Sequence, residues 1–271
     1  MVVVPIAFAC ATLLSLLVTW RALRARPRQG AGWLAATMAG VTWWSFMWLL
    51  QTVVSNREGL RMTFNALHWI GVGAVAVGVL GFGLALTGRE EWLTRPRIVG
   101  LSVVPALATA SWLADPRVVD LVASTARIPI AVAWALDTVA SAWSWFEWVA
   151  LLYLYGLAAV GSAFVLEAAL ERPKWAPDRV LLVVMIAVPG AVNVASELDA
   201  IPYPGFDPTV LGFVVTGLAG IAAIDRFRLF NVPFARSQLV EQLSTPVLVY
   251  GRDHRVYDYN EAAARLLHVG A

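Results

Sequence analysis

Seven long apolar stretches constrain this chain more than any other feature of its sequence. A membrane-spanning helix needs about 20 mostly apolar residues, with a range of about 17–25. The stretches come close to that length and run over 2–20, 33–54, 63–87, 98–114, 146–168, 180–196 and 208–223. The chain of 271 residues is 59% hydrophobic and 14% charged, whereas soluble domains have about 25% charged residues. The sequence therefore predicts an all-α membrane protein, a bundle of seven transmembrane helices.

Basic residues fall unevenly on the two sets of loops between these stretches. One set carries Arg21, Arg24, Arg26, Arg28, Arg89, Arg95, Arg97, Arg172, Lys174, Arg179, Arg226, Arg228 and Arg236. The other set carries only Arg57, Arg61, Arg117 and Arg127. Because basic loops stay in the cytoplasm during insertion, we expect a multi-pass cell-membrane protein with its N-terminus outside and its C-terminus in the cytoplasm.

Several functional classes lack the residues they need. A covalent retinal pigment requires a lysine in its last helix for the Schiff base, and the one lysine, Lys174, falls in a cytoplasmic loop. The one cysteine, Cys10, allows no intrachain disulfide. No metal-binding spacing, phosphate-binding loop or nucleophile motif is present. We therefore expect no metal, no cofactor, no nucleic-acid partner and no catalytic constellation.

Polar residues near the outer ends of the expected helices are candidates for a sensing site. Asn65 and His68 lie one turn apart, either as hydrogen-bonding groups or as a ligand- or proton-sensing pair. Glu147 begins the fifth helix, and Asn193 and Glu197 end the sixth. Carboxylates beside an apolar span are costly unless they are paired or hydrated. These residues either face water or form an outward-facing pocket for a cation or a small polar ligand.

Small residues predict close contacts between helices. In the third helix they are Gly71, Gly73, Gly78, Gly81 and Gly83, and we expect the same role for Gly156 and Gly161 in the fifth.

The composition changes after the seventh stretch. Residues 237–243 predict a short helix, 245–250 and 256–259 predict two strands, and Asn260 predicts the N-cap of a helix over 261–267. This order is the beginning of an α/β module. The longest outer loop, 115–145, is open to two interpretations: a strand over 127–134 or a surface helix over 131–145.

The chain resembles the N-terminal seven-transmembrane sensor region of prokaryotic histidine kinases, in particular the type common in haloarchaea. The stretches that carry the resemblance are Phe82–Arg95, which contains Thr-Gly-Arg, then Val103–Pro105, Tyr153–Leu157, Asp207–Thr209, Asp225–Phe230 and Val232–Arg236. The segments 240–243, 247–250 and 257–264 are similar to the start of a PAS domain, with Glu261 where that domain usually has proline.

The resemblance implies three parts: a seven-transmembrane sensor domain over 1–226, a signalling linker helix over 227–243 and a truncated PAS-like start over 244–271. It implies a membrane-embedded input module that relays an extracellular or intramembrane stimulus to a PAS and kinase output. The expected partners are the lipid bilayer, a second copy joined through the linker and PAS region, and a cytoplasmic kinase or response regulator. The relay residues that it implies are Asp225, Arg226, Arg228, Pro233 and Arg236.

The sequence has no phosphoacceptor histidine box and no ATP-binding motif, so we expect no enzyme activity from the chain itself. Two other functions stay open. One is a membrane carrier for a small solute, although no internal repeat supports it. The other is a membrane scaffold without a signalling role. The stimulus is not evident from the sequence.

Overall fold

The computed structural model describes residues 3–26, 28–54, 57–114, 118–119, 146–171, 177–198, 200, 207–226, 243–250 and 256–267. The chain divides into two compact units, residues 1–229 and 230–271, and each is described by itself. The expected helix over 237–243, except for Leu243, and both interpretations of the outer loop fall outside the described residues.

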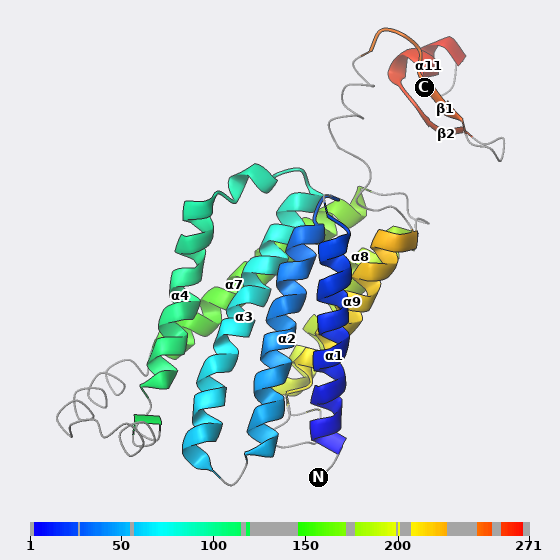
Figure 1. Ribbon diagram of the computed structural model, residues 1–271. Coiled ribbons are helices and arrows are strands. Elements are labelled where there is room, and N and C mark those ends of the chain that lie inside the picture. The colour runs from blue at the N-terminus through cyan, green and yellow to red at the C-terminus, as the bar shows by residue number, and fades with distance from the viewer. Residues whose placement is uncertain are drawn as a thin grey trace. The chain divides into compact units, whose positions relative to one another are not determined.

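Helices build the first unit (Figure 1). Within its described residues, seven helices have 18 to 29 residues: α1 (Val3–Arg24), α2 (Ala31–Val53), α3 (Glu58–Leu86), α4 (Arg95–Leu113), α7 (Phe146–Leu170), α8 (Pro177–Glu197) and α9 (Thr209–Arg226). A short 3-10 helix, η1 (Glu90–Trp92), precedes α4. Each of the seven apolar stretches overlaps one of these helices.

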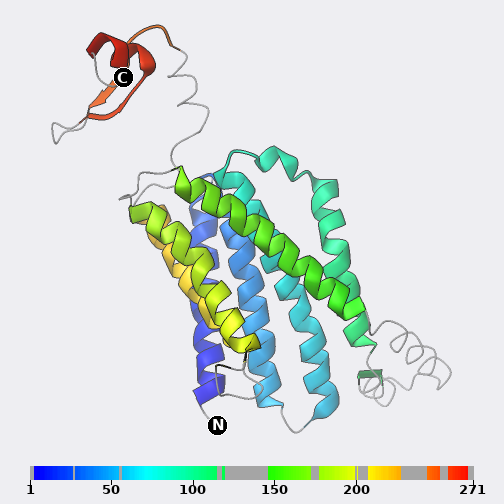
Figure 2. The same ribbon diagram turned by 180° about the vertical axis from the view of Figure 1, so that it is seen from behind.

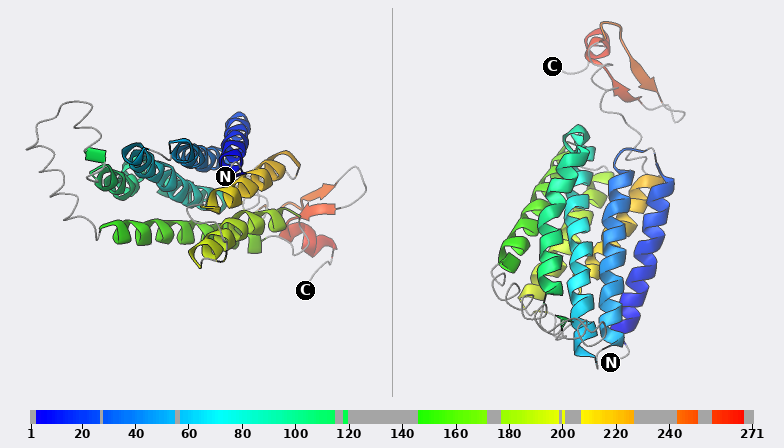
Figure 3. Two further views of the ribbon diagram at one scale, coloured as in Figure 1. Left: turned by 90° about the horizontal axis from the view of Figure 1, so that it is seen from below. Right: turned by 60° about the vertical axis from the view of Figure 1, so that its left-hand side comes forward.

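The helices form two layers. Helices α1 to α4 stand side by side in chain order, while α7 and α8 lie behind them and α9 lies between α8 and α1 (Figure 3). Seen from behind, α7 crosses the bundle obliquely (Figure 2). Helix α3 contacts α2, α4 and α7, and 72% of its apolar 18-residue window is buried.

Within the part of the chain that the structure describes, five helices are long and apolar enough to cross a membrane: α1, α3, α4, α7 and α8. Helix α9 has a shorter apolar part, and α2 carries four tryptophans among its apolar residues. Large apolar side chains cover the outside of the bundle, for example Leu13 at 67% exposure and Leu152 at 75%. Such a surface suits hydrocarbon rather than water.

Glycines bring α2 and α3 into backbone contact. A Cβ added to Gly71 would lie 2.6 Å from the Gly40 carbonyl oxygen, and a Cβ on Gly40 would lie 2.8 Å from the Gly71 carbonyl oxygen. A Cβ on Gly81 would enter the ring of Trp33. We call the contact between Gly40 and Gly71 the glycine seam. It confirms the expected role of small residues in α3.

The two glycines of α7 differ. A Cβ on Gly161 would lie 2.6 Å from the Leu80 amide nitrogen, so Gly161 is a close-contact residue as expected. A Cβ on Gly156 would meet nothing within 4 Å. The prediction that Gly156 allows close helix contact is therefore wrong, because Gly156 lies on an exposed face of α7.

Two helices contain an internal proline, and each is completed by a hydroxyl from another helix. Proline lacks the N–H that would bond the carbonyl four residues earlier. In α4, Pro105 frees the Leu101 carbonyl, which accepts a hydrogen bond from the Tyr153 hydroxyl at 3.0 Å. In α8, Pro189 frees the Met185 carbonyl, which accepts one from the Thr216 hydroxyl at 2.6 Å. Neighbouring side chains thus satisfy backbone groups that water cannot reach.

The end of α3 follows from Thr87-Gly88-Arg89. Gly88 has φ 72°, a left-handed conformation that glycine adopts without strain. The Arg89 N–H bonds the Leu84 carbonyl at 2.8 Å and the Gly88 N–H bonds that of Ala85 at 3.2 Å, the pattern of a Schellman motif. The Arg89 guanidinium then makes two hydrogen bonds of 2.8 Å to the Glu167 carboxylate, which joins the end of α3 to α7.

The second unit contains β1 (Leu248–Tyr250), β2 (Val256–Tyr259) and α11 (Glu261–Leu267). The strands pair antiparallel, with Leu248 opposite Tyr259. Asn260 is fully buried, and its Oδ1 accepts hydrogen bonds from the Val247 N–H at 2.9 Å and the Ala263 N–H at 3.0 Å. The second of these bonds confirms Asn260 as the N-cap of the helix, and the first ties the helix to the residue before β1.

Candidate functional site

A cavity of about 500 Å³ lies between the two layers of the first unit. Its walls come from α2, α3, α7, α8 and α9, and most of the side chains that line it are aliphatic or aromatic. Ligand pockets commonly have volumes of about 300–1,000 Å³, with a few polar groups among apolar ones. The lining along α7 runs from Leu151 to Val165, a rise of roughly 21 Å. The cavity is therefore large enough for an elongated small molecule.

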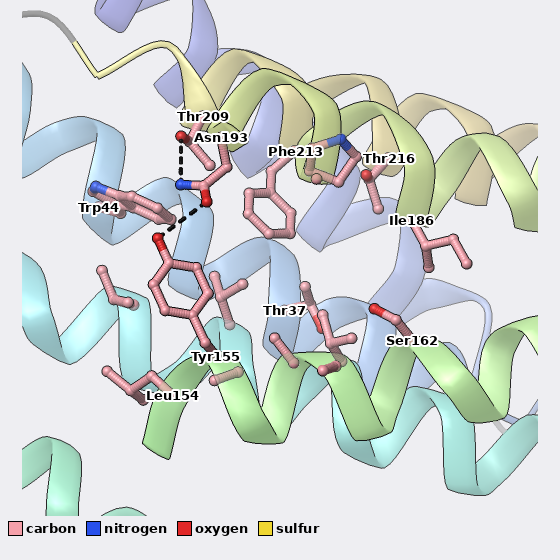
Figure 4. A pocket seen from close by; sticks show the side chains of 18 of the residues that line it. Thr37, Trp44, Leu154, Tyr155, Ser162, Ile186, Asn193, Thr209, Phe213 and Thr216 are labelled. Carbon is pink, nitrogen blue, oxygen red and sulfur yellow. Dashed lines mark hydrogen bonds between the residues drawn. The ribbon is translucent and has the colours of Figure 1, made fainter. Parts of the chain in front are cut away.

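A chain of hydrogen bonds occupies one end of this cavity (Figure 4). The Tyr155 hydroxyl donates to Asn193 Oδ1 at 3.0 Å, and Asn193 Nδ2 donates to the Thr209 hydroxyl oxygen at 3.2 Å. The Thr209 N–H donates to Asp207 Oδ1 at 3.0 Å, and the Thr209 side chain also bonds Asp207. We call these four residues the polar chain. Every donor along it points toward Asp207, so the carboxylate is its final acceptor.

Asp207 also lies at the N-terminus of α9, two residues before Thr209. Its carboxylate bonds the N–H of Thr209, and Pro208 stands between them, an order that favours helix initiation. Burial raises the pKa of Asp207, while its hydrogen bonds from Thr209 lower it. Within the described residues that line the cavity, Asp207 is the one carboxylate, and none is Lys or Arg.

An aromatic cluster adjoins the polar chain. The His68 ring lies 5.3 Å from that of Trp69, 6.1 Å from Trp48 and 6.4 Å from Trp44, and the Trp44 ring lies 6.1 Å from that of Phe213. His68 Nδ1 bonds the backbone carbonyl of Asn65. A carbonyl only accepts hydrogen bonds, so this contact assigns the proton to Nδ1.

The indole N–H groups of Trp44, Trp48 and Trp69 have no acceptor among the described residues. Trp44 and Trp69 line the cavity, and Trp44 is only 7% exposed. Buried donors are usually hydrogen-bonded. The cluster therefore brings aromatic rings to the same end of the cavity as the polar chain.

One protein-family model matches most of the length of this chain. Residues 5–233 match the family model of the N-terminal 7TM region of histidine kinase. The chain belongs to this family. No curated protein and no solved structure matches it. The match covers the helices that enclose the cavity, so the cavity lies within a transmembrane sensor region, a part of histidine kinases distinct from the catalytic domain.

Only some of the residues that the sequence predicted as site residues lie at the cavity. His68 and Asn193 both line the cavity, whereas Asn65 contributes its backbone carbonyl to His68 and is not among the lining residues. Glu147 and Glu197 lie in the first turn of α7 and the last turn of α8, and their side chains are outside what the structure describes.

The predicted relay residues lie at or beyond the end of α9. Asp225 and Arg226 belong to its last turn, with their side chains outside the description. Arg228, Pro233 and Arg236 fall outside the described residues altogether.

The cavity residues that the sequence did not predict as site residues include four that make the hydrogen bonds described above: Tyr155, Asp207, Thr209 and Thr216. Signals for three of them were present. Tyr155 lies in one stretch that carries the family resemblance and Asp207–Thr209 is another, while Asp-Pro at the start of an apolar run indicates a helix N-cap. Thr216 has no such signal, because its partner is a carbonyl freed by a proline in another helix.

Proposed function

We propose that this chain is the sensory input module of a two-component histidine kinase. The family match over residues 5–233 carries this proposal. In the arrangement we propose, all seven long helices cross the cell membrane, the N-terminus is outside, and the second unit is a PAS-like start in the cytoplasm. The uneven distribution of basic residues supports this orientation.

The proposed relay runs from the cavity into α9. A stimulus that binds one of two packing states more tightly shifts the population toward that state. Thr209, Phe213 and Thr216 line the cavity from α9, and α9 ends at Arg226, next to the segment that leads to the second unit. The shift would then pass through residues 225–243 to a PAS and kinase dimer. The relay residues Asp225, Arg226, Arg228, Pro233 and Arg236 belong to this proposed path.

The contact between α8 and α9 supports that path. The Thr216 hydroxyl completes α8 at the carbonyl that Pro189 frees. A Cβ on Gly212 would lie 2.8 Å from the Pro189 Cα, so the two helices are in close contact there. Movement of α8 around the proline is therefore coupled directly to α9.

A fusion of residues 1–243 to a reporter kinase tests the proposal. We expect kinase output to change when one residue or more is inserted after Arg226, because an insertion rotates the output domain relative to α9. Thr216→Val should also change the output, whereas Gly156→Leu, on an exposed face of α7, should not. Output that is indifferent to the insertions would remove the signalling proposal.

The cavity also suits a carrier for a small solute, since one of its walls is a helix with an internal proline. Uptake into proteoliposomes distinguishes the two functions. A sensor is expected to bind its ligand without moving it, whereas a carrier accumulates the solute inside the vesicles.

A further inference from the structure

The cavity joins a carboxylate to a long apolar wall, and this combination indicates a ligand class. Asp207 lines the cavity at its polar end, and neither Lys nor Arg is among the described lining residues. A carboxylate beside a membrane-spanning bundle is normally compensated by a positive charge or by water. The question is which positive group suits this place.

The role of Asp207 as a helix cap accounts for only part of its chemistry. Asn and Ser cap helices about as well as Asp, without a charge. The α9 dipole supplies about half of a positive charge at the N-terminus of the helix, less than a full counter-ion. The bonds from Thr209 orient the carboxylate but leave its net charge unchanged.

The surroundings of Asp207 suit an organic cation. Aromatic rings attract cations that lie over their faces, and this effect increases when water is excluded. Trp44, Tyr155 and Phe213 line the cavity, and Figure 4 shows Trp44 and Tyr155 at the same end as Asn193 and Thr209. A cationic group at this end would therefore meet a carboxylate and aromatic faces together.

The remainder of the cavity suits a hydrocarbon group. From the level of Tyr155 to that of Val165, the α7 wall rises roughly 15 Å and includes Ala158, Ala159 and Ser162. Met185, Ile186 and Pro189 face it from α8. Burial of hydrocarbon here stabilises a complex by about 0.8 kcal/mol for each CH₂ group.

We propose that this cavity binds a lipophilic ammonium ion, with the ammonium group beside Asp207 and the hydrocarbon chain between α7 and α8. This deepens the proposed function by naming the ligand class of the sensor. Binding does not depend on that function, because the cavity exists whether or not the chain signals.

The test uses the full chain in phosphatidylcholine nanodiscs, with binding followed by tryptophan fluorescence above the baseline of empty nanodiscs. The probes are n-octylammonium, 1-octanol and n-butylammonium. We expect saturable binding of n-octylammonium that is at least tenfold tighter than that of either other probe. 1-Octanol lacks the charge, and n-butylammonium lacks half of the hydrocarbon.

Two variants keep the test independent of folding. Asp207→Asn retains the helix cap, so we expect unchanged expression and a loss of the tenfold preference for n-octylammonium over 1-octanol. Ala158→Phe fills the hydrocarbon part and should weaken both eight-carbon probes. The proposal is overturned if no probe binds saturably, if 1-octanol binds as tightly as n-octylammonium, or if Asp207→Asn keeps the preference.

The reporter fusion separates this proposal from the proposed function. If n-octylammonium binds with the expected preference but leaves kinase output unchanged at saturation, the ligand class stands and its role as the signal fails. If the insertions after Arg226 change the output while no probe binds, the sensor function stands and the ligand class fails.

Discussion

The glycine seam and the cavity are built from opposite kinds of contact, although α3 contributes to both. At the seam, backbones of α2 and α3 touch directly, since a Cβ on either Gly40 or Gly71 would lie within 3 Å of the other helix. Across the cavity, α7 and α8 leave about 500 Å³ between themselves and the other helices. Of an apolar 18-residue window in α3, 72% is buried, against 22% in α7 and 17% in α8. The seam is therefore a region where two backbones pack against each other, whereas more of α7 and α8 faces outward around the cavity.

The largest effect is expected at the seam. Gly71→Leu would place a side chain against the Gly40 carbonyl and the Trp44 N–H, and we expect a loss of about 3 kcal/mol or more, at or above the upper range for overpacked cores. Gly156→Leu, where a Cβ meets nothing within 4 Å, is the matched control. Thermal unfolding in detergent measures both. Equal losses for the two variants would mean that the seam is no more rigid than the α7 face.

Gly81→Leu places the same change against Trp33. We expect it to disrupt packing as well, though less than Gly71→Leu, because a side chain is displaced more easily than a backbone. Unchanged thermal stability would contradict this.

The next prediction concerns the contact between α8 and α9. Thr216→Val keeps the side-chain shape but leaves the Met185 carbonyl without its hydroxyl donor, which we expect to cost about 1–3 kcal/mol. Thr216→Ser retains the hydroxyl and should lose less. Thermal unfolding measures the loss of stability in both variants. If Thr216→Ser loses as much stability as Thr216→Val, the methyl group and not the hydrogen bond is responsible.

At the polar end of the cavity, we expect a substitution that increases the stability of the protein, whereas the substitutions above decrease it. Burial raises the pKa of Asp207, so its charged form opposes folding. Without ligand, we expect Asp207→Asn to raise the unfolding temperature at neutral pH. Below the ordinary carboxyl pKa of about 3.9, Asp207 is protonated in both states and the difference should vanish. A melting series from pH 3 to pH 8 checks this, and a difference that grows toward acid pH would contradict it.

The smallest effect is expected at the pair between Arg89 and Glu167. Glu167 holds the pKa of Arg89 above its ordinary value through hydrogen bonds, but both side chains are exposed, at 49% and 38%, and water screens such pairs. Glu167→Gln should lower the unfolding temperature slightly, and less so in high salt. A loss as large as that of Thr216→Val would mean that this pair, rather than the close contact at Gly161, holds α3 against α7.

The sequence predicted the elements well because the signals for them are local. Apolar runs of the right length mark the seven long helices, and Asn260 before Glu261 marks the start of α11. Contacts between helices were harder to predict. Gly161 and Gly156 lie five residues apart in one helix, yet only Gly161 faces a neighbour, because composition alone does not tell which face of a helix is buried.

The site was predicted less well for the same reason. His68 and Asn193 line the cavity as candidates, but the polar chain joins residues from α7, α8 and the start of α9 that are far apart in sequence. Their meeting depends on how these helices cross. The role of Thr216 requires knowing that it lies opposite Met185, which no local pattern indicates.

The two proline-containing helices also bear on how the protein is made. The hydroxyl that completes α4 comes from Tyr153, 52 residues after Leu101, and the one that completes α8 comes from Thr216, 31 residues after Met185. In both cases the donor is synthesised after the helix that needs it. A carbonyl without a donor in hydrocarbon costs several kcal/mol. In the membrane arrangement that we propose, α4 and α8 would enter the bilayer incomplete, and the arrival of α7 and α9 would stabilise them, which favours assembly in the order of synthesis.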